Sequence, residues 1–179
     1  MRDPGKPVLA GLRLWAPLLL CLALTACPYG GPVPLDAPEA GTLDQRLLGR
    51  WVQHHEKDRG FAEFEFFAFN AHEYYVAMLN HEPFKPEEAA HYRVFSSAVG
   101  GRTFLNCRDL REKESYILAV YEFPDPETMA LSFVKDDAMK PAGEVKTSQA
   151  LRRFVARHMA EPGFFEPGFT LQRAEPARQ

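Results

Sequence analysis

The sequence predicts a mainly β fold, in which eight short antiparallel strands form a sandwich or barrel and one helix precedes the last strand. Three observations favour this fold class: short apolar segments recur at nearly regular spacing, several of them alternate apolar and polar residues, and one long gap contains a helical stripe. Regularly spaced short strands are typical of antiparallel sandwiches and barrels rather than of alternating β-α units.

The composition is that of one folded domain with appendages. The chain has 179 residues, of which 46% are hydrophobic and 25% charged, and chains of this length usually form one domain. Its 21 basic and 24 acidic residues give a net charge of −3. Because phosphate binding needs a clustered positive field, nucleic acid is not an expected partner.

Residues 1–26 have the pattern of an export signal. Arg2, Lys6 and Arg13 precede an apolar run over residues 14–24, which is broken only by Pro17. This is the positively charged start and short hydrophobic stretch of a signal peptide, and the run is too short to span a bilayer. An ordinary secretory signal or a buried apolar helix are the alternatives.

The run ends in Leu24-Thr25-Ala26-Cys27, which resembles the lipobox of bacterial lipoproteins. The resemblance implies cleavage before Cys27 and attachment of fatty-acyl chains such as palmitate to that residue, so the membrane is an expected partner. Two or more acyl chains make anchoring stable. Pro28, in the place where Asp favours inner-membrane retention, implies the periplasmic face of the outer membrane.

Residues 27–42 are rich in proline and glycine and have no apolar periodicity, which predicts a tether before a folded domain over residues 43–179. Three cysteines are present. With Cys21 removed and Cys27 acylated, Cys107 has no partner for an intramolecular disulfide, and we interpret it as a small buried hydrophobe.

The predicted strands and their turns follow from local patterns. Gly100-Gly101 supplies a two-residue hairpin turn, Asn70-Ala71 joins the second and third strands, and Pro124-Asp125-Pro126 ends the sixth. The expected strands cover residues 48–54, 62–69, 73–79, 91–98, 102–108, 115–123, 128–134 and 169–173.

Alternation predicts which side chains face inward. Phe64 and Phe66 share one face of the second strand, and Leu131 and Phe133 share one face of the seventh. The sixth strand is apolar on both faces, so another element must cover its outer side. A helix over about residues 147–159, capped by Thr147 or Ser148, supplies an apolar stripe for this purpose.

The first strand begins with Gly49-Arg50-Trp51, which resembles the Gly-x-Trp opening of the lipocalin and fatty-acid-binding (calycin) barrels. In those families the tryptophan closes one end of the barrel, and an arginine near the end of the last strand packs across it. Arg173 occupies the matching place. The resemblance implies a lipocalin-like barrel closed by Gly49, Trp51 and Arg173, although the helix here precedes the last strand instead of following the eighth.

Fourteen phenylalanines, all between Phe61 and Phe169, permit two interpretations. They could line a cavity for a hydrophobic small molecule or lipid, with Phe64, Phe66, Leu131 and Phe133 as ligand-binding residues. They could equally fill the barrel, which would then serve an envelope assembly as an interaction module. In that case the segment 81–86, with Phe84 among prolines, is the expected docking surface.

No catalytic, metal or cofactor site is predicted. His54, His55, His72, His81, His91 and His158 show no spacing that would place two metal ligands on one element. Glu87-Glu88 and Asp136-Asp137 are interpreted as solvated charges, and no nucleophile elbow, phosphate loop or zinc-protease motif occurs. We therefore expect a protein that is not an enzyme and has no cofactor. A metal- or haem-dependent enzyme, with its site assembled from distant strands, is the alternative.

Overall fold

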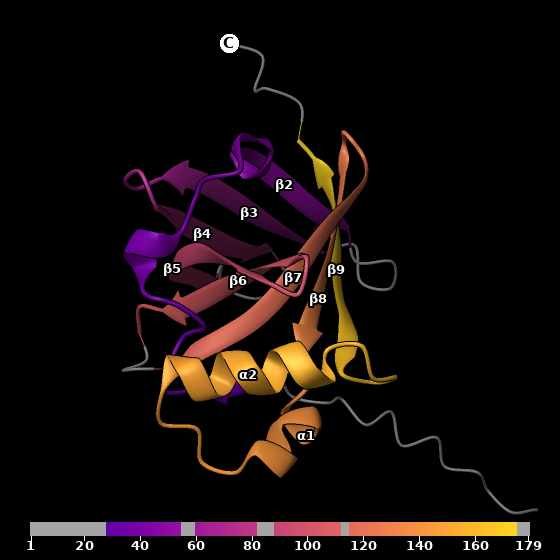
Figure 1. Ribbon diagram of the computed structural model, residues 1–179. Coiled ribbons are helices and arrows are strands. Elements are labelled where there is room, and N and C mark those ends of the chain that lie inside the picture. Colours follow the sequence, from indigo (N-terminus) through magenta and orange to yellow (C-terminus); the bar gives the residue numbers. More distant parts are fainter. Residues whose placement is uncertain (1–27, 55–59, 82–87, 112–114, 175–179) are drawn as a thin grey trace, which may run out of the picture.

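The computed structural model describes residues 28–54, 60–81, 88–111 and 115–174. It is mainly β, with eight antiparallel strands closed into a barrel (Figure 1). Each strand pairs with the next, and the last pairs with the first through Trp51 and Arg173. This confirms the predicted fold class. The barrel strands are β2 (Gly49–His54), β3 (Phe61–Ala68), β4 (Glu73–His81), β5 (Glu88–Val99), β6 (Arg102–Asp109), β7 (Tyr116–Asp125), β8 (Thr128–Val134) and β9 (Phe165–Arg173).

Two of the three predicted turns lie where the local sequence places them, whereas β7 continues through Pro124 to Asp125 instead of ending at residue 123. Gly100 and Gly101 have φ of 57° and 81°, which a two-residue turn of this kind requires and which side chains with a Cβ rarely adopt. Val99 pairs with Arg102 across it. Between β3 and β4, the Asn70 side chain accepts hydrogen bonds from the backbone N–H groups of His72 and Glu73.

Helix α2 (Ser148–His158) lies across the outside of the barrel, beside β7 and β8 in Figure 1. The Thr147 hydroxyl accepts a hydrogen bond from the Ala150 N–H and caps its first turn. Leu151 and Val155 are fully buried and belong to a second apolar cluster with Leu118 and Val120 of β7. The helix therefore covers the outer face of β7. This cover is what the sequence predicts, because β7 is apolar on both of its faces.

The segment of residues 28–42, predicted to be a tether, is packed against the barrel, so that prediction is wrong for these residues. Tyr29 and Leu35 are 8% and 1% exposed, and the Leu35 N–H donates to the Asn106 side chain at 2.8 Å. Strand β1 (Gly30–Gly31) pairs with the start of β7. The neighbouring strand β8 pairs with β7 only from Ala119 onward, so it leaves this start without a partner on that side. Unpaired backbone groups there need partners, and residues 28–42 belong to the packed part of the described chain, ahead of the predicted domain boundary at residue 43.

Two smaller differences concern the connection between β8 and β9. The last strand begins at Phe165 and not at residue 169. It includes Pro167 and Gly168, and the pairing of β8 with β9 is irregular at this point, between Ala130 and Ser132. Two short elements were not predicted, α1 (Asp136–Met139) and the 3-10 helix η3 (Lys140–Ala142). The helix predicted over about residues 147–159 is present as α2, which ends at His158. Within the described residues, no helix is long and apolar enough to cross a membrane.

Candidate functional site

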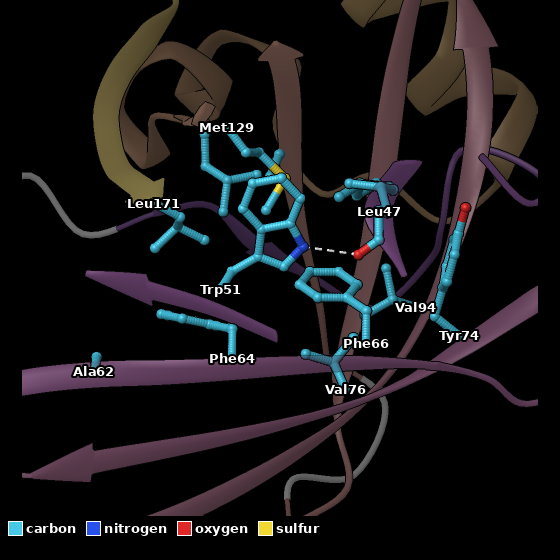
Figure 2. Close-up of a cluster of buried hydrophobic side chains, with 13 residues drawn as sticks. Leu47, Trp51, Ala62, Phe64, Phe66, Tyr74, Val76, Val94, Met129 and Leu171 are labelled. Carbon is cyan, nitrogen blue, oxygen red and sulfur yellow. Dashed lines mark hydrogen bonds between the residues drawn. The ribbon is translucent and has the colours of Figure 1, made fainter. Parts of the chain in front are cut away.

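One end of the barrel is closed by Trp51, which is fully buried (Figure 2). Its indole N–H donates to the Leu47 carbonyl at 2.9 Å. That carbonyl belongs to the 3-10 helix η2 (Gln45–Leu47), which lies just before β2. Met129 and Leu171, both fully buried, belong to the same cluster and lie near the indole in Figure 2. We call this the closed end.

Arg173 holds the closed end together from the last strand. Its guanidinium carbon lies 4.2 Å from the centroid of the Trp51 ring. The same group donates hydrogen bonds to the carbonyls of Arg46 at 2.7 Å and Leu48 at 3.2 Å. Gly49 has φ of 104°, so the chain turns into β2 at a position that favours glycine. This is the arrangement of Gly49, Trp51 and Arg173 that the calycin resemblance implies.

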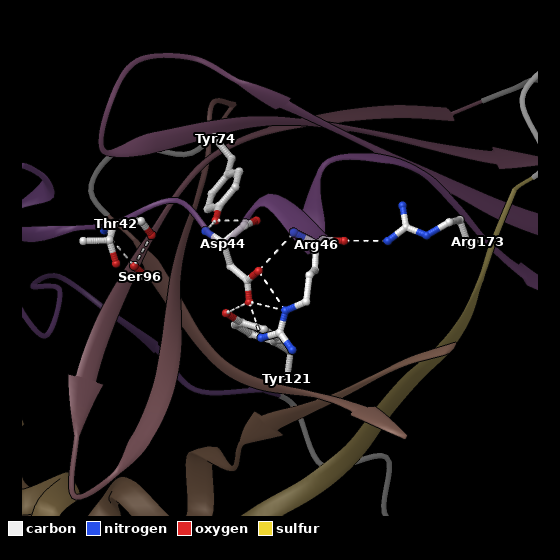
Figure 3. Close-up of polar contacts among 7 residues, drawn as sticks. All are labelled: Thr42, Asp44, Arg46, Tyr74, Ser96, Tyr121 and Arg173. Carbon is white, nitrogen blue, oxygen red and sulfur yellow. Dashed lines mark hydrogen bonds and ion pairs between the residues drawn. The ribbon is translucent and has the colours of Figure 1, made fainter. Parts of the chain in front are cut away.

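A polar network supports the chain that enters β2 (Figure 3). The Asp44 carboxylate accepts hydrogen bonds from the Arg46 guanidinium and, at 3.1 Å, from the Tyr121 hydroxyl. The Asp44 N–H donates to the Tyr74 hydroxyl. The Arg46 side chain lowers the pKa of Asp44, whereas burial raises the pKa of Tyr74 to about 12. These hydrogen bonds join η2 to β4 and β7 and so fix the closed end.

The barrel interior beyond the closed end contains a cavity of about 410 Å³. This falls within the range of roughly 300–1,000 Å³ typical of small-molecule sites. Phe64, Phe66, Leu131 and Phe133, the four residues predicted to contact a ligand, all line it. The other lining residues are also mostly apolar; they are Pro28, Val76, Met78, Tyr92, Val94, Leu105, Cys107, Ile117, Ala119, Pro167, Gly168 and Phe169.

The interpretation of a solidly packed barrel is therefore not supported, because the phenylalanines leave this space unfilled. The Phe169 ring lies 5.3 Å from Phe64 and 5.6 Å from Phe133, centroid to centroid. The three rings thus form a continuous aromatic wall. An apolar wall of this kind suits an acyl chain, an aromatic group or an isoprenoid. The free energy gained by burying such a group does not depend on how the group is oriented.

A few polar side chains lie on the inward side of the strands near the end opposite Trp51, which we call the mouth. Asp109 is 8% exposed and accepts hydrogen bonds from Arg111, which lowers its pKa. Gln53 follows Trp51 by two residues and so faces inward. Its side-chain oxygen is buried and has no hydrogen-bond partner within the described part of the chain.

Cys107 lines the cavity and is a free cysteine. Burial raises the pKa of its thiol to about 12, so the nucleophilic thiolate is scarce near neutral pH. This agrees with the interpretation of Cys107 as an apolar residue. Because Cys107 lines the cavity, the rate at which its thiol reacts can report on access to the cavity.

The histidines form no metal site among the residues that the structure describes. His72 contacts the Gly41 carbonyl at 2.8 Å, His91 contacts the Tyr75 hydroxyl at 2.8 Å, and His158 contacts Glu161 at 2.7 Å. His81 stacks on Phe61. His55 and Phe84, together with residues 82–87, lie outside the described ranges.

Sequence reasoning missed part of the cavity wall. Val76 and Met78 of β4, and Leu105 and Cys107 of β6, continue the same alternation that identified Phe64 and Phe66. Extending the two-residue period to every strand would have found them. No sequence signal identifies Pro28, whose place in the wall depends on the packing of the N-terminal segment.

Comparisons with protein-family models, with curated proteins and with solved structures gave no match. The site is therefore interpreted from its own geometry.

Proposed function

We propose that this chain is a lipid-anchored protein of the periplasmic face of the outer membrane, whose lipocalin-like barrel binds a hydrophobic small molecule or lipid. The observation that supports binding most directly is the apolar cavity of about 410 Å³ inside the barrel. It adjoins four predicted ligand-binding residues: Phe64, Phe66, Leu131 and Phe133. The lipobox-like sequence at Cys27 supports the anchor.

Binding is tested by extracting the purified protein with organic solvent and analysing the extract by mass spectrometry. We expect one lipid-like molecule per chain in addition to the acyl chains on Cys27, and displacement of a fluorescent fatty-acid probe by that molecule. Repeated recovery of empty protein that also fails to bind the probe would contradict the proposal.

The anchor is tested separately by Cys27→Ser. Because the thiol is the acylated group, the variant should accumulate as uncleaved precursor and lose its partitioning into detergent. The matched control is Cys107→Ser, which removes the thiol of the barrel interior and leaves the lipobox intact. Processing and membrane association of Cys27→Ser at the level of the parent protein would contradict lipidation.

The alternative is an interaction module of an envelope assembly. One observation favours it: Phe67 and Phe69 on the outside of the sheet are 44% and 53% exposed. However, Phe69 is already covered on one side by the Arg93 guanidinium, whose carbon lies 3.5 Å from the ring centroid. The cavity has no role in this alternative, so we favour ligand binding.

A further inference from the structure

The chain enters the barrel at the rim of the cavity. Pro28 is exposed, lines the cavity, and forms an isolated β-bridge with Lys135, directly after β8. The next residue is held firmly, because the Tyr29 N–H donates to the Val134 carbonyl at 2.8 Å and Tyr29 is only 8% exposed. The N-terminal end of the described chain is therefore fixed to the cavity wall.

Pro28 lies at the mouth and not at the closed end. It shares the cavity wall with Ile117 at the start of β7, Phe133 at the end of β8 and Pro167 at the start of β9. These three strand ends meet at one end of the barrel because neighbouring strands are antiparallel. Trp51 and Arg173 close the other end.

This position matters because Cys27, the predicted acylation site, is covalently joined to Pro28. Consecutive Cα atoms are about 3.8 Å apart. Since Pro28 forms a β-bridge with Lys135 and Tyr29 is buried, no flexible spacer separates the predicted acylation site from the rim of the cavity. The acyl chains must enter the bilayer close to the mouth.

The rim has a second apolar feature. Leu110 follows β6 at the mouth and is 46% exposed, while its N–H donates to the His91 carbonyl. Its backbone is thus fixed at this end of the barrel, and its side chain is partly exposed there. Apolar side chains of this kind enter the interface of a bilayer when an anchor brings them there.

We propose that the barrel stands on the membrane with its mouth toward the bilayer, and that the cavity exchanges acyl chains of membrane lipids directly with that bilayer. This rests on the proposed function, and it specifies the ligand as a membrane lipid. Moving a methylene group from water into the cavity is favourable, but moving one from the bilayer into the cavity changes its free energy little. Exchange in both directions is therefore the expected activity.

Orientation is tested with the acylated full chain in vesicles of phosphatidylethanolamine with a minor share of phosphatidylglycerol. In a Cys107→Ala background, a fluorophore is attached at Leu110→Cys near the mouth or at Ala71→Cys near the closed end. Both positions are exposed. Doxyl-labelled lipid should quench the fluorophore at position 110 and leave the one at position 71 bright. Equal quenching, or stronger quenching at position 71, would overturn the proposed orientation.

Exchange is tested with a flexible Gly/Ser spacer inserted between Cys27 and Pro28. The spacer keeps the anchor and the barrel but frees the mouth from the bilayer. Loading of pyrene-labelled phosphatidylethanolamine from the vesicles should slow by about tenfold or more, because the local concentration of bilayer lipid at the mouth falls. The matched control carries the same spacer after Gly143, in an exposed turn, and should load at the parent rate.

The outcomes separate the two proposals. Slower loading only in the Cys27–Pro28 insertion supports exchange at the mouth. Equal loading rates in all three proteins would overturn it and leave lipid binding intact. If none of them takes up labelled lipid while all unfold at the parent temperature, both the exchange and the proposed lipid binding fall.

Discussion

The Arg173 guanidinium lies over the Trp51 ring at 4.2 Å and donates hydrogen bonds to the carbonyls of Arg46 and Leu48. One side chain of the last strand therefore contacts the first strand and the residues that lead into it. The two residues are also directly paired in the sheet, across the seam that closes the barrel. Closure of the barrel and closure of its end thus depend on the same pair.

Trp51→Ala should destabilise the domain by about 3–5 kcal/mol, because a fully buried large aromatic side chain is lost and a cavity remains at the closed end. Urea unfolding followed by circular dichroism measures this change. Phe67→Ala is the control. Its ring is 44% exposed, and surface changes are usually within about 0.5 kcal/mol. An unchanged unfolding midpoint for Trp51→Ala would contradict the role assigned to this residue.

Asp44→Asn should remove a pH-dependent part of the stability. The Arg46 guanidinium lowers the folded-state pKa of Asp44 below its ordinary value of 3.8. The ionised carboxylate therefore stabilises the fold above about pH 4, and this contribution is lost as the pH falls through the lowered pKa. The difference in unfolding free energy between parent and variant should be larger at neutral pH than at acid pH. A difference that stays constant between these pH values would contradict this role.

Cys107 should react slowly with thiol reagents. Burial raises its pKa to about 12, so at pH 8 the thiolate fraction falls on the order of a thousandfold relative to an ordinary cysteine. The rate of alkylation by iodoacetamide measures this effect, with urea-unfolded protein as the control. We expect lipid in the cavity to slow the reaction further. Reaction of the folded, empty protein at the unfolded rate would contradict burial of this thiol.

Ala119→Phe should block binding without removing the fold. Ala119 lines the cavity from β7 and is 1% exposed, so a phenyl group at this position would occupy space that a ligand needs. Ala77→Phe is the matched control, because the alternation that points Val76 and Met78 inward points Ala77 outward. Fluorescent fatty-acid titration should show binding lost only in the first variant. Equal affinity in both would place the ligand elsewhere.

The cavity test and the thiol test support each other. If Ala119→Phe fills the same space that Cys107 faces, it should also slow alkylation by excluding the reagent. This outcome needs no knowledge of the natural ligand.

The sequence by itself determined the strands, their inward faces and the covering helix, because these depend on local patterns. The two-residue period identified Phe64, Phe66, Leu131 and Phe133 as inward-facing, and the apolar outer face of β7 required the helix that packs there. The tertiary structure alone decided that the interior retains a cavity, since that depends on how side chains from different strands fit together. It also decided that residues 28–42 pack on the barrel. The start of β7 supplies hydrogen-bond partners for the backbone of Gly30 and Gly31. No pattern within a proline- and glycine-rich segment can reveal that such partners exist.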